Sequence, residues 1–333
     1  MESLRRYILN YAGHLKVDPR YGVAVASLGQ WLGTKQVGIN VVLLPPGTRS
    51  SQPHAESLEE EFGYVLYGNP SVWINGETYR LGPGHAVGFP SGTGLCHTIL
   101  NDGPGPACVL AIGERTKPEN QWIAPLNPER RQSAGGTEWW ESWPAQKFGP
   151  HPGIPGSGLE PMEPEGVPEI LFAPGLPGRA SFSYSGDTET FTEGVRLNAR
   201  LKLKAVGINH EILPPGKRTS WPHAESKEEE FCFVLHGHPT IWINGHLLPA
   251  KPGDLVFFAP GTNLAHTVLN ETSEPVEFLG FGPTSEACPG NRIYYPFHDA
   301  RNADCRARGD LWEDRPAVTL GPDDGRARKQ PRV

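Results

Sequence analysis

The stretch VGINVVLLPPGTRSSQPHAESLEEEFGYVLYGNPSVWING, which begins at Val37, returns as VGINHEILPPGKRTSWPHAESKEEEFCFVLHGHPTIWING from Val206. The offset is 169 residues (206 − 37), and it continues without a gap to Asn101 and Asn270. More than half of the aligned positions are identical. The units of solenoid proteins run to only about 20 to 50 residues. A repeat this long therefore indicates a duplicated domain.

Each copy has the pattern of short strands separated by tight turns. Asn75-Gly76 and Asn244-Gly245 have the composition of a type I′ hairpin turn, in which both residues take a positive φ. The chain contains 40 Gly and 35 Pro, residues that favour turns and interrupt helices. The sequence therefore predicts an all-β protein with two tandem β-barrels and short helical or irregular arms.

The regions around the barrels give the expected domain limits. Leu4, Tyr7, Ile8 and Tyr11 recur at helical spacing, so residues 1–20 are expected to form a helical arm. This arm would pack on the first barrel or cross to a partner subunit in a homodimer. The other expected regions are barrel one at residues 21–130, a Trp-containing arm and Pro/Gly-rich linker at residues 131–178, barrel two at residues 179–300, and a C-terminal arm and tail at residues 301–333.

Composition argues against several classes of protein. The net charge of −7 and the pI near 6.0 leave no basic surface for nucleic acid. No apolar run approaches the roughly 18 residues of a membrane span, and the N-terminus does not have the pattern of a secretory signal. The five cysteines are sparse and odd in number, as expected for reduced thiols. We therefore expect a cytoplasmic protein whose partner is a small molecule.

Four acidic and imidazole side chains recur in both copies at the same spacing. His54-x-Glu56 places two side chains on one face of a strand, because alternate strand residues point the same way. Glu61 begins the next strand, and His97 comes from a distant one. A closed barrel would bring all four into one interior. The equivalent residues of the second copy are His223, Glu225, Glu230 and His266.

These two motifs, present in order and present twice, resemble those of the cupin superfamily, and the duplication resembles the bicupins. The resemblance covers about residues 25–115 and 195–285, and it implies a small jelly-roll-like barrel that holds a divalent metal, usually through three His and one Glu. Transferred onto matching positions, the implied ligands are His54, Glu61 and His97 in the first copy and His223, Glu230 and His266 in the second. This chain departs from the family pattern at the second His, where it has Glu56 and Glu225.

The two unusual glutamates leave two alternatives open. Glu56 and Glu225 are either metal ligands, which would make the site less positively charged, or general bases beside the metal. In the second case two His and one carboxylate remain on the metal, the arrangement of non-haem Fe(II) oxygenases. Imidazole and carboxylate donors suit a divalent transition metal such as Fe, Mn, Zn or Ni.

The leading hypothesis is a metal-dependent enzyme that acts on a small organic molecule as an oxidoreductase of the dioxygenase type. The first alternative is a metal-dependent isomerase, cyclase or lyase, in which Glu56 or Glu225 moves a proton. The second alternative is a non-catalytic ligand-binding or structural bicupin.

Differences between the copies predict unequal barrels. Cys232 and His236 are expected to face inward where the first copy has Gly63 and Tyr67. His210 replaces Val41, so barrel two is expected to be narrower and richer in polar groups near its site. Barrel one is therefore expected to be the roomier. The acidic residues Glu59, Glu60, Glu228 and Glu229 are expected to form a solvated edge.

Overall fold

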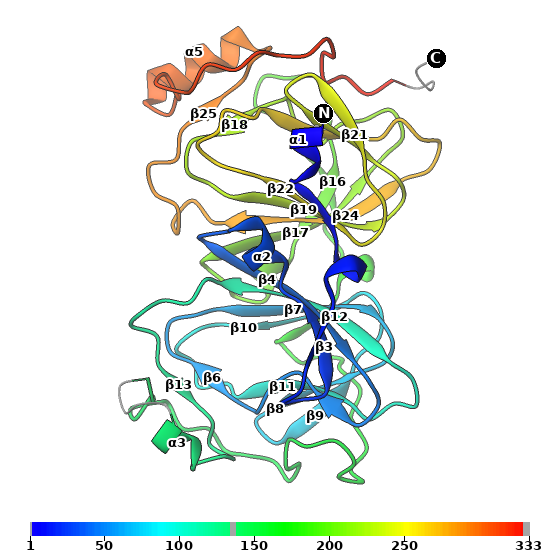
Figure 1. Ribbon diagram of the computed structural model, residues 1–333, viewed down its shortest axis with the longest axis vertical. Helices are drawn as coiled ribbons and strands as arrows, with labels where there is room; N and C mark the ends of the chain where they lie inside the picture. The colour runs from blue at the N-terminus through cyan, green and yellow to red at the C-terminus, as the bar shows by residue number, and fades with distance from the viewer. Residues whose placement is uncertain (1, 134–137, 329–333) are drawn as a thin grey trace. The chain divides into compact units, whose positions relative to one another are not determined.

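The computed structural model describes residues 2–133 and 138–328, and in it the chain folds into two compact units. One unit consists of Ala12–Gly175 and Leu197–Val206, and it contains the first barrel. The other is formed by the N-terminal segment to Tyr11, by Leu176–Arg196 and by the chain from Gly207 onward, and it contains the second barrel. Strands predominate over helices in the described residues (Figure 1), so the all-β prediction is confirmed.

In the first unit the strands are β2 (Lys16–Asp18), β3 (Val23–Ala26), β4 (Val37–Leu44), β5 (Thr48–Arg49), β6 (Ala55–Glu56), β7 (Glu61–Tyr67), β8 (Ser71–Ile74), β9 (Glu77–Arg80), β10 (His85–Phe89), β11 (His97–Asn101), β12 (Ala107–Glu114), β13 (Trp122–Ile123) and β14 (Ile170–Phe172). Its helical segments are η1 (Tyr11–His14), α2 (Leu28–Leu32), α3 (Arg130–Ser133), η2 (Ala173–Gly175) and α4 (Leu197–Arg200).

In the second unit the strands are β1 (Ile8–Asn10), β15 (Ala180–Ser181), β16 (Glu193–Arg196), β17 (Val206–Leu213), β18 (Ala224–Glu225), β19 (Glu230–His236), β20 (Thr240–Ile243), β21 (His246–Pro249), β22 (Asp254–Phe258), β23 (His266–Leu269), β24 (Val276–Pro283) and β25 (Ile293–Tyr294). Its helices are α1 (Glu2–Arg5) and α5 (Asp299–Arg308).

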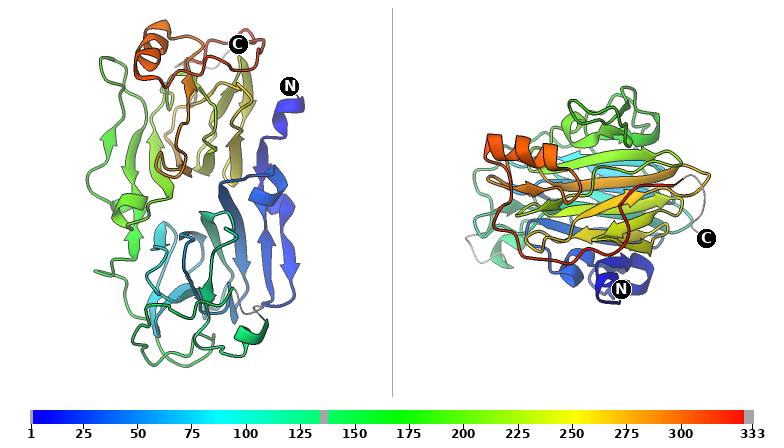
Figure 2. Two further views of the ribbon diagram at one scale, coloured as in Figure 1. Left: turned by 90° about the vertical axis from the view of Figure 1, so that its left-hand side faces the viewer. Right: turned by 90° about the horizontal axis from the view of Figure 1, so that it is seen from above.

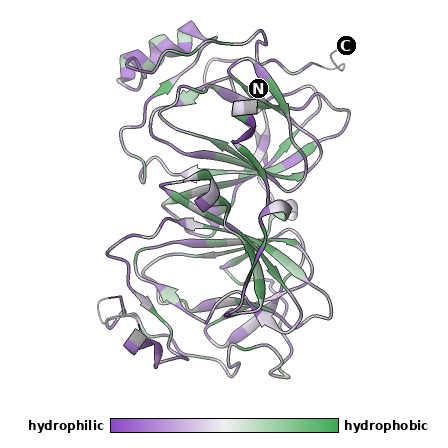
Figure 3. Cartoon of the chain, viewed as in Figure 1, coloured by the Kyte–Doolittle hydropathy of each residue, from purple (hydrophilic) through white to green (hydrophobic). Residues whose placement is uncertain are grey.

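Each barrel is built from one seven-stranded sheet and one smaller sheet. In the first unit the order β14-β10-β7-β12-β4-β3-β2 faces the order β5-β11-β8-β9. In the second unit the order β1-β22-β19-β24-β17-β16-β15 faces the order β21-β20-β23. Apolar side chains from both sheets fill the space between them, among them Val65, Val87 and Ile99 in the first barrel. Figure 3 shows green, hydrophobic segments in the strands of both barrels.

The N-terminal segment forms an edge strand, and the prediction of a helical arm holds only as far as Arg5. Strand β1 pairs antiparallel with β22, with Ile8 opposite Val256. The side chains of Leu4 and Ile8 pack on the core of the second barrel, so the expected packing on the first barrel is wrong. Open backbone groups at the edge of β22 account for the difference, because they offer hydrogen bonds that override helical spacing. Figure 2 shows this segment in blue beside the second barrel.

Strand β14 occupies the same place in the first barrel. Ile170 lies opposite Val87 on β10, and Val87 is the repeat equivalent of Val256 (256 − 87 = 169). Each barrel therefore receives one edge strand from the segment that precedes the other copy of the repeat.

The hairpin turns follow the sequence prediction. Asn75 and Gly76 have φ of 46° and 88°, and Asn244 and Gly245 have φ of 46° and 81°. Gly76 also permits close packing, since a β-carbon there would lie 2.3 Å from the backbone nitrogen of Gly149. The arm that follows each barrel is thereby packed onto the hairpin between β8 and β9 or its equivalent.

The remaining sequence features fit this arrangement. Trp140 and Trp312, the anchors of the two arms, are buried in apolar clusters. All five cysteines lie in the described part of the chain, where they are buried and form no disulfide. Within residues 2–133 and 138–328, no helix is both long and apolar enough to cross a membrane. Residues 329–333 of the predicted C-terminal tail lie outside the described residues.

Candidate metal centres

In the first barrel, three of the predicted ligands lie together. His54 precedes β6, Glu61 begins β7 and His97 begins β11. Nε2 of His97 is 2.6 Å from Oε2 of Glu61, and Nε2 of His54 is 3.4 Å from the same oxygen. One potential donor atom from each residue lies within 4.8 Å of the others. A single ion could therefore contact all three side chains.

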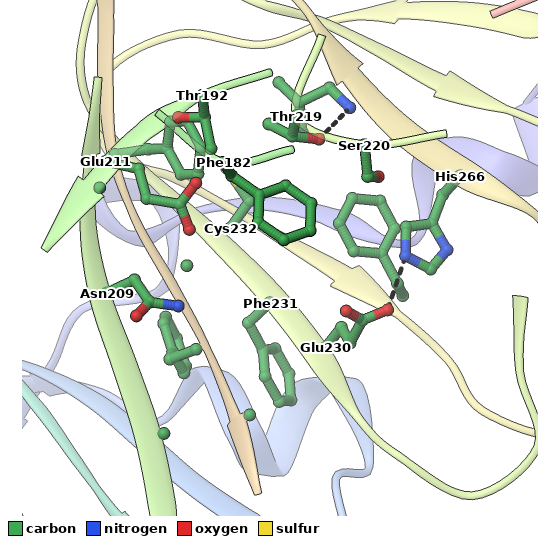
Figure 4. A pocket seen from close by; sticks show the side chains of 18 of the residues that line it. Phe182, Thr192, Asn209, Glu211, Thr219, Ser220, Glu230, Phe231, Cys232 and His266 are labelled. Carbon is green, nitrogen blue, oxygen red and sulfur yellow. Dashed lines mark hydrogen bonds and ion pairs between the residues drawn. The ribbon is translucent and has the colours of Figure 1, made fainter. Parts of the chain in front are cut away.

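The second barrel repeats this arrangement. Nε2 of His266 is 2.8 Å from Oε2 of Glu230, and Nε2 of His223 is 3.4 Å from that oxygen. The three donor atoms again lie within 4.8 Å of one another. Figure 4 shows the contact between His266 and Glu230 as a dashed line.

Short backbone bridges set the positions of the two imidazoles. In the first barrel the backbone nitrogen of His54 donates to the backbone oxygen of His97 over 3.3 Å. The backbone nitrogen of His97 donates to the backbone oxygen of His54 over 2.9 Å. His223 and His266 are bridged in the same way, at 3.2 and 2.9 Å. Directly opposed residues on antiparallel strands hold their side chains close together. The two rings therefore converge because the backbone pairs at these positions.

The hydrogen bonds of the imidazoles suit metal binding. Nδ1 of His54 donates to Gln52 O over 2.8 Å, and Nδ1 of His97 donates to Leu95 O over 3.1 Å. A carbonyl oxygen can only accept, so the proton lies on Nδ1 and a neutral ring has its Nε2 lone pair available. His223 and His266 make the equivalent bonds to Trp221 O and Leu264 O. The donor set and its orientation fit a divalent transition metal.

Aromatic stacking fixes one imidazole of each set. The ring of Phe89 lies parallel to that of His97, with centroids 3.6 Å apart and 4° between the planes. Phe258 stacks on His266 at 3.8 Å and 5°. Both His97 and His266 are buried, so their rings are held by packing as well as by hydrogen bonds.

The buried charges shift one another's titration. Burial lowers the pKa of His54, but the adjacent Glu61 and Glu56 carboxylates raise it to about 9 overall. Burial raises the pKa of Glu61, yet the two imidazoles hold it well below its ordinary value. The pKa of His223 is likewise raised to about 9, with Glu230 as the main opposing cause to burial. Each centre thus holds a protonated imidazole beside a carboxylate. A divalent cation can take the place of the proton and supply the positive charge.

Glu56 and Glu225 stand aside from these three-residue groups. Oε2 of Glu56 accepts a 2.5 Å hydrogen bond from Nδ2 of Asn120, and its Oε1 is 3.7 Å from Nε2 of His54. Glu225 is held by Asn291 over 2.5 Å and lies 3.9 Å from His223. Burial raises the pKa of Glu56 to about 7, and burial together with Glu230 raises that of Glu225 to about 8.

The two asparagines were not identified from the sequence. Oδ1 of Asn120 accepts from the backbone nitrogen of Leu58 over 2.9 Å, which fixes the amide for its bond to Glu56. Asn291 accepts from Lys227 N over 3.0 Å in the second unit. An Asn at both positions is a signal in the repeat, but it lies beyond the gapless alignment, at an offset of 171 residues (291 − 120).

The cavities beside the two centres differ in size, in the opposite sense to the prediction. The cavity in barrel two measures about 550 Å³ and that in barrel one about 80 Å³. Gly63 and Cys232 line them as expected. A β-bulge between Val234 and His236 reverses the strand alternation, so His236 is exposed.

Two further expectations about polar residues were wrong. His210 lies outside the cavity and is buried against Glu277, with Nε2 2.7 Å from Oε1. The acidic edge is only partly solvated, because Glu60 and Glu229 are buried. Glu60 accepts hydrogen bonds from the backbone of Lys204 and Ala205, and this packing explains its burial.

Comparison with solved structures identifies proteins of the same fold. A putative glyoxylate-induced protein from Pseudomonas aeruginosa has a TM-score of 0.56 at 13% identity, covering 83% of this chain and 88% of that one. An oxalate decarboxylase from Lactobacillus farciminis in complex with formate has a TM-score of 0.54 at 14% identity, with coverage of 93% and 96%. Oxalate decarboxylase from Bacillus subtilis, studied for its Mn(II) centres, has a TM-score of 0.53 at 16% identity, with coverage of 92% and 85%.

Comparison by sequence gives the family. No curated protein matches the chain. The sequence model of the cupin domain matches residues 40–113 and residues 209–281, one match in each copy of the repeat. The chain therefore belongs to the cupin superfamily and is a bicupin, with two tandem cupin barrels.

Proposed function

We propose that this bicupin is a metal-dependent enzyme that acts on a small organic molecule, with the chemistry of a non-haem oxygenase. Divalent Fe, Mn, Zn or Ni would be held by His54, Glu61 and His97 in barrel one. The same metal would be held by His223, Glu230 and His266 in barrel two. The observation that carries the proposal is the convergence of two imidazoles and one carboxylate, with a second carboxylate held aside by an asparagine.

Two His and one carboxylate leave coordination positions open for other ligands. A metal bound there would supply a place where O₂ and a substrate oxygen meet. The chain's own contribution is to orient the donors and to hold a proton nearby. Glu225 suits the second task because its carboxyl group is buried and its pKa is raised to about 8, so it can gain or lose a proton near neutral pH.

A metal-dependent lyase or isomerase is the second candidate, and the raised pKa values of Glu56 and Glu225 favour it. A base of near-neutral pKa next to a metal-bound carbonyl is what proton abstraction requires. Two structures of similar fold are named as decarboxylases, which release CO₂ without net oxidation. Their low identity limits that likeness to the fold.

The test combines elemental analysis with oxygen uptake. The protein as purified is expected to hold up to two transition metal ions, and turnover of a substrate found by screening small organic acids, amines and phenols should consume O₂. Turnover without O₂ consumption would favour the lyase or isomerase. A protein that binds none of the four metals, even when they are added, would contradict both proposals.

We also propose that the protein works in the cytoplasm. Five cysteines that are all buried and not cross-linked support this proposal, because reduced thiols are usual there. A homodimer stays a prediction, and light scattering on the purified protein would test it.

A further inference from the structure

The larger cavity, in barrel two, has two acidic residues besides Glu230, namely Glu211 and Glu228. Glu211 projects from β17 into this cavity, and Figure 4 shows its carboxylate across the space from His266 and Glu230. At the aligned position barrel one has Val42 (211 − 42 = 169), which lines the small cavity. The glutamate is thus a feature of one barrel only.

Two glycines make room for Glu211. A β-carbon at position 280 would lie 2.6 Å from Oε1 of Glu211, and one at position 194 would lie 3.5 Å from its Cγ. The repeat equivalents in barrel one are Ala111 and Val25. A glutamate at position 42 would therefore contact the side chains of Ala111 and Val25, whereas barrel two has glycines at these positions. The three differences together indicate a site built for a carboxylate.

A hairpin contributes aromatic rings to the same cavity. Phe182 and Tyr184 line it, with ring centroids 4.8 Å apart. The hairpin is held by Phe182 N, which donates to Thr192 O over 2.8 Å, and by Arg301, whose guanidinium lies 3.7 Å from the Tyr184 ring centroid. The equivalent hairpin of barrel one pairs Lys16 with Val25 where barrel two pairs Ala180 with Gly194, so barrel one has Asp18 rather than an aromatic residue at the position of Phe182.

The charges around Glu211 call for a positively charged partner. Burial raises the pKa of Glu211 to about 7, against a hydrogen bond with Thr192 that lowers it, and the charge of Glu230 raises it further. The guanidinium of Arg179, which lowers that pKa, is engaged by His210, with bonds of 3.0 Å to O and 2.8 Å to Nδ1. Among the described residues that line the cavity, Arg196 is the one Arg or Lys, and it is exposed. A buried carboxylate is costly unless an opposite charge accompanies it.

We propose that the barrel-two cavity binds a small aromatic amine, with its ring against Phe182 and its ammonium group on Glu211. The inference rests on the proposed function, because it places the rest of the ligand toward the metal centre. A volume of about 550 Å³ is within the range of about 300 to 1,000 Å³ typical of small-molecule sites, whereas about 80 Å³ is far below it. A small dianion is disfavoured, since Glu211 and Glu230 both line the cavity.

Isothermal titration calorimetry at pH 8.5 with benzylamine, benzyl alcohol and benzoate tests the proposal. The three probes share a ring and differ in charge, and at this pH Glu211 is ionised while a primary alkylamine stays protonated. We expect benzylamine to bind about tenfold more tightly than either other probe, the contribution of a hydrogen bond between charged groups. Equal binding of benzyl alcohol, or tighter binding of benzoate, would overturn the inference.

Variants locate the contact. Glu211→Gln is nearly isosteric, and we expect it to weaken benzylamine binding about tenfold while leaving benzyl alcohol unchanged. Gly280→Ala keeps the charge but displaces the carboxylate, so it should weaken benzylamine binding as well. Glu193→Gln is the matched control, because it makes the same charge change on the adjacent strand β16 outside the cavity. A Glu211→Gln protein with the wild-type preference for benzylamine would refute the site.

Metal content measured on the same preparations separates the two proposals. Glu211→Gln is expected to retain the metal content of the wild type. If metal is bound but benzylamine is not preferred, the inference fails and the proposed function stands. If benzylamine is preferred but no added metal binds, the proposed function fails and Glu211 still marks an amine site.

Discussion

Asn120 and Glu56 are joined by a 2.5 Å hydrogen bond from the amide Nδ2 to the carboxylate Oε2, and Asn291 and Glu225 repeat it at the same length. The asparagine holds one carboxylate oxygen of each glutamate, while the other oxygen lies 3.7 Å from Nε2 of His54 or 3.9 Å from Nε2 of His223. In each centre three donor groups, rather than four, lie within 4.8 Å of one another. The choice between a metal ligand and a free acid or base therefore depends on a residue that lies outside the sequence motif.

Replacing Asn291 by Ala should release Glu225 toward the metal. We expect metal affinity to be kept or increased and activity to fall about 10- to 100-fold, the usual effect of removing a group that orients a metal site. Competition with a chelator measures the affinity, and turnover measures the activity. Asn127→Ala is the control, since Asn127 bonds the exposed Glu129 away from the centre. Unchanged activity in Asn291→Ala would show that the position of Glu225 does not matter.

Removal of one imidazole from each barrel should abolish metal binding. The double variant His97→Ala/His266→Ala is expected to contain no transition metal, because only one imidazole and one carboxylate remain in each centre. Elemental analysis after dialysis measures this directly. His14→Ala/His246→Ala is the matched control, as neither residue belongs to the two groups. Wild-type metal content in the first variant would contradict the ligand assignment.

The stability of the metal-free protein should fall as pH rises from 6.5 to 9. In the folded state His54 and His223 have pKa values of about 9, whereas the ordinary value for histidine, which applies to the unfolded chain, is 6.5. The native state thus holds these protons more tightly, and the stabilisation, complete below pH 6.5, is lost as pH rises through 9. The raised pKa values of Glu56 and Glu225, about 7 and 8, act in the same direction.

Thermal unfolding in EDTA measures this dependence. The lowered pKa values of Glu61 and Glu230 contribute stability that is lost only as pH falls below 4.5, so they do not affect the window. We expect Tm to fall by several degrees between pH 6.5 and 9 in EDTA, and to fall less with metal bound, because the cation replaces the proton. A Tm in EDTA that rises across this range would contradict the charge assignment.

The sequence predicts those parts of the fold that short-range chemistry determines. Asn75-Gly76 forms its turn because both residues tolerate positive φ. The repeat predicted two barrels, and a closed barrel was expected to bring His54, Glu61 and His97 into one interior. The N-terminal segment was predicted wrongly because its helical spacing competes with the open edge of β22, a partner more than 240 residues away in sequence (254 − 10 = 244). No local pattern reveals such a partner.

The candidate site shows the same limit. His236 faces outward because a β-bulge breaks the alternation of β19, and a bulge leaves no mark in the two-residue period. Glu211, and not its neighbour His210, lines the cavity, because adjacent strand residues point to opposite faces and the two-residue period alone does not say which face of β17 is inside. The substitution of Val42 by Glu211 between the copies was visible, but its meaning depends on Gly194 and Gly280 lying beside it. Position in space, rather than residue type, supplied the missing information.

Substituting the unusual glutamate by the residue that the family has in its place tests which barrel works. Glu225→His should keep the metal, because an imidazole is a suitable ligand, and should lower activity at least tenfold, because the buried acid or base is lost. Glu56→His is expected to leave turnover nearly unchanged, since a cavity of about 80 Å³ beside Glu61 leaves little room for substrate. Barrel two, with about 550 Å³, is therefore the expected site of reaction.

Metal content and turnover measured on one preparation of each variant decide the matter. Metal and activity both near wild type in Glu225→His would show that the glutamate has no special role. Loss of activity in Glu56→His with full activity in Glu225→His would place the reaction in barrel one, and the small cavity would then have to open for substrate. Equal loss in both variants would mean that the two centres act together, because each barrel has its own complete set of donors.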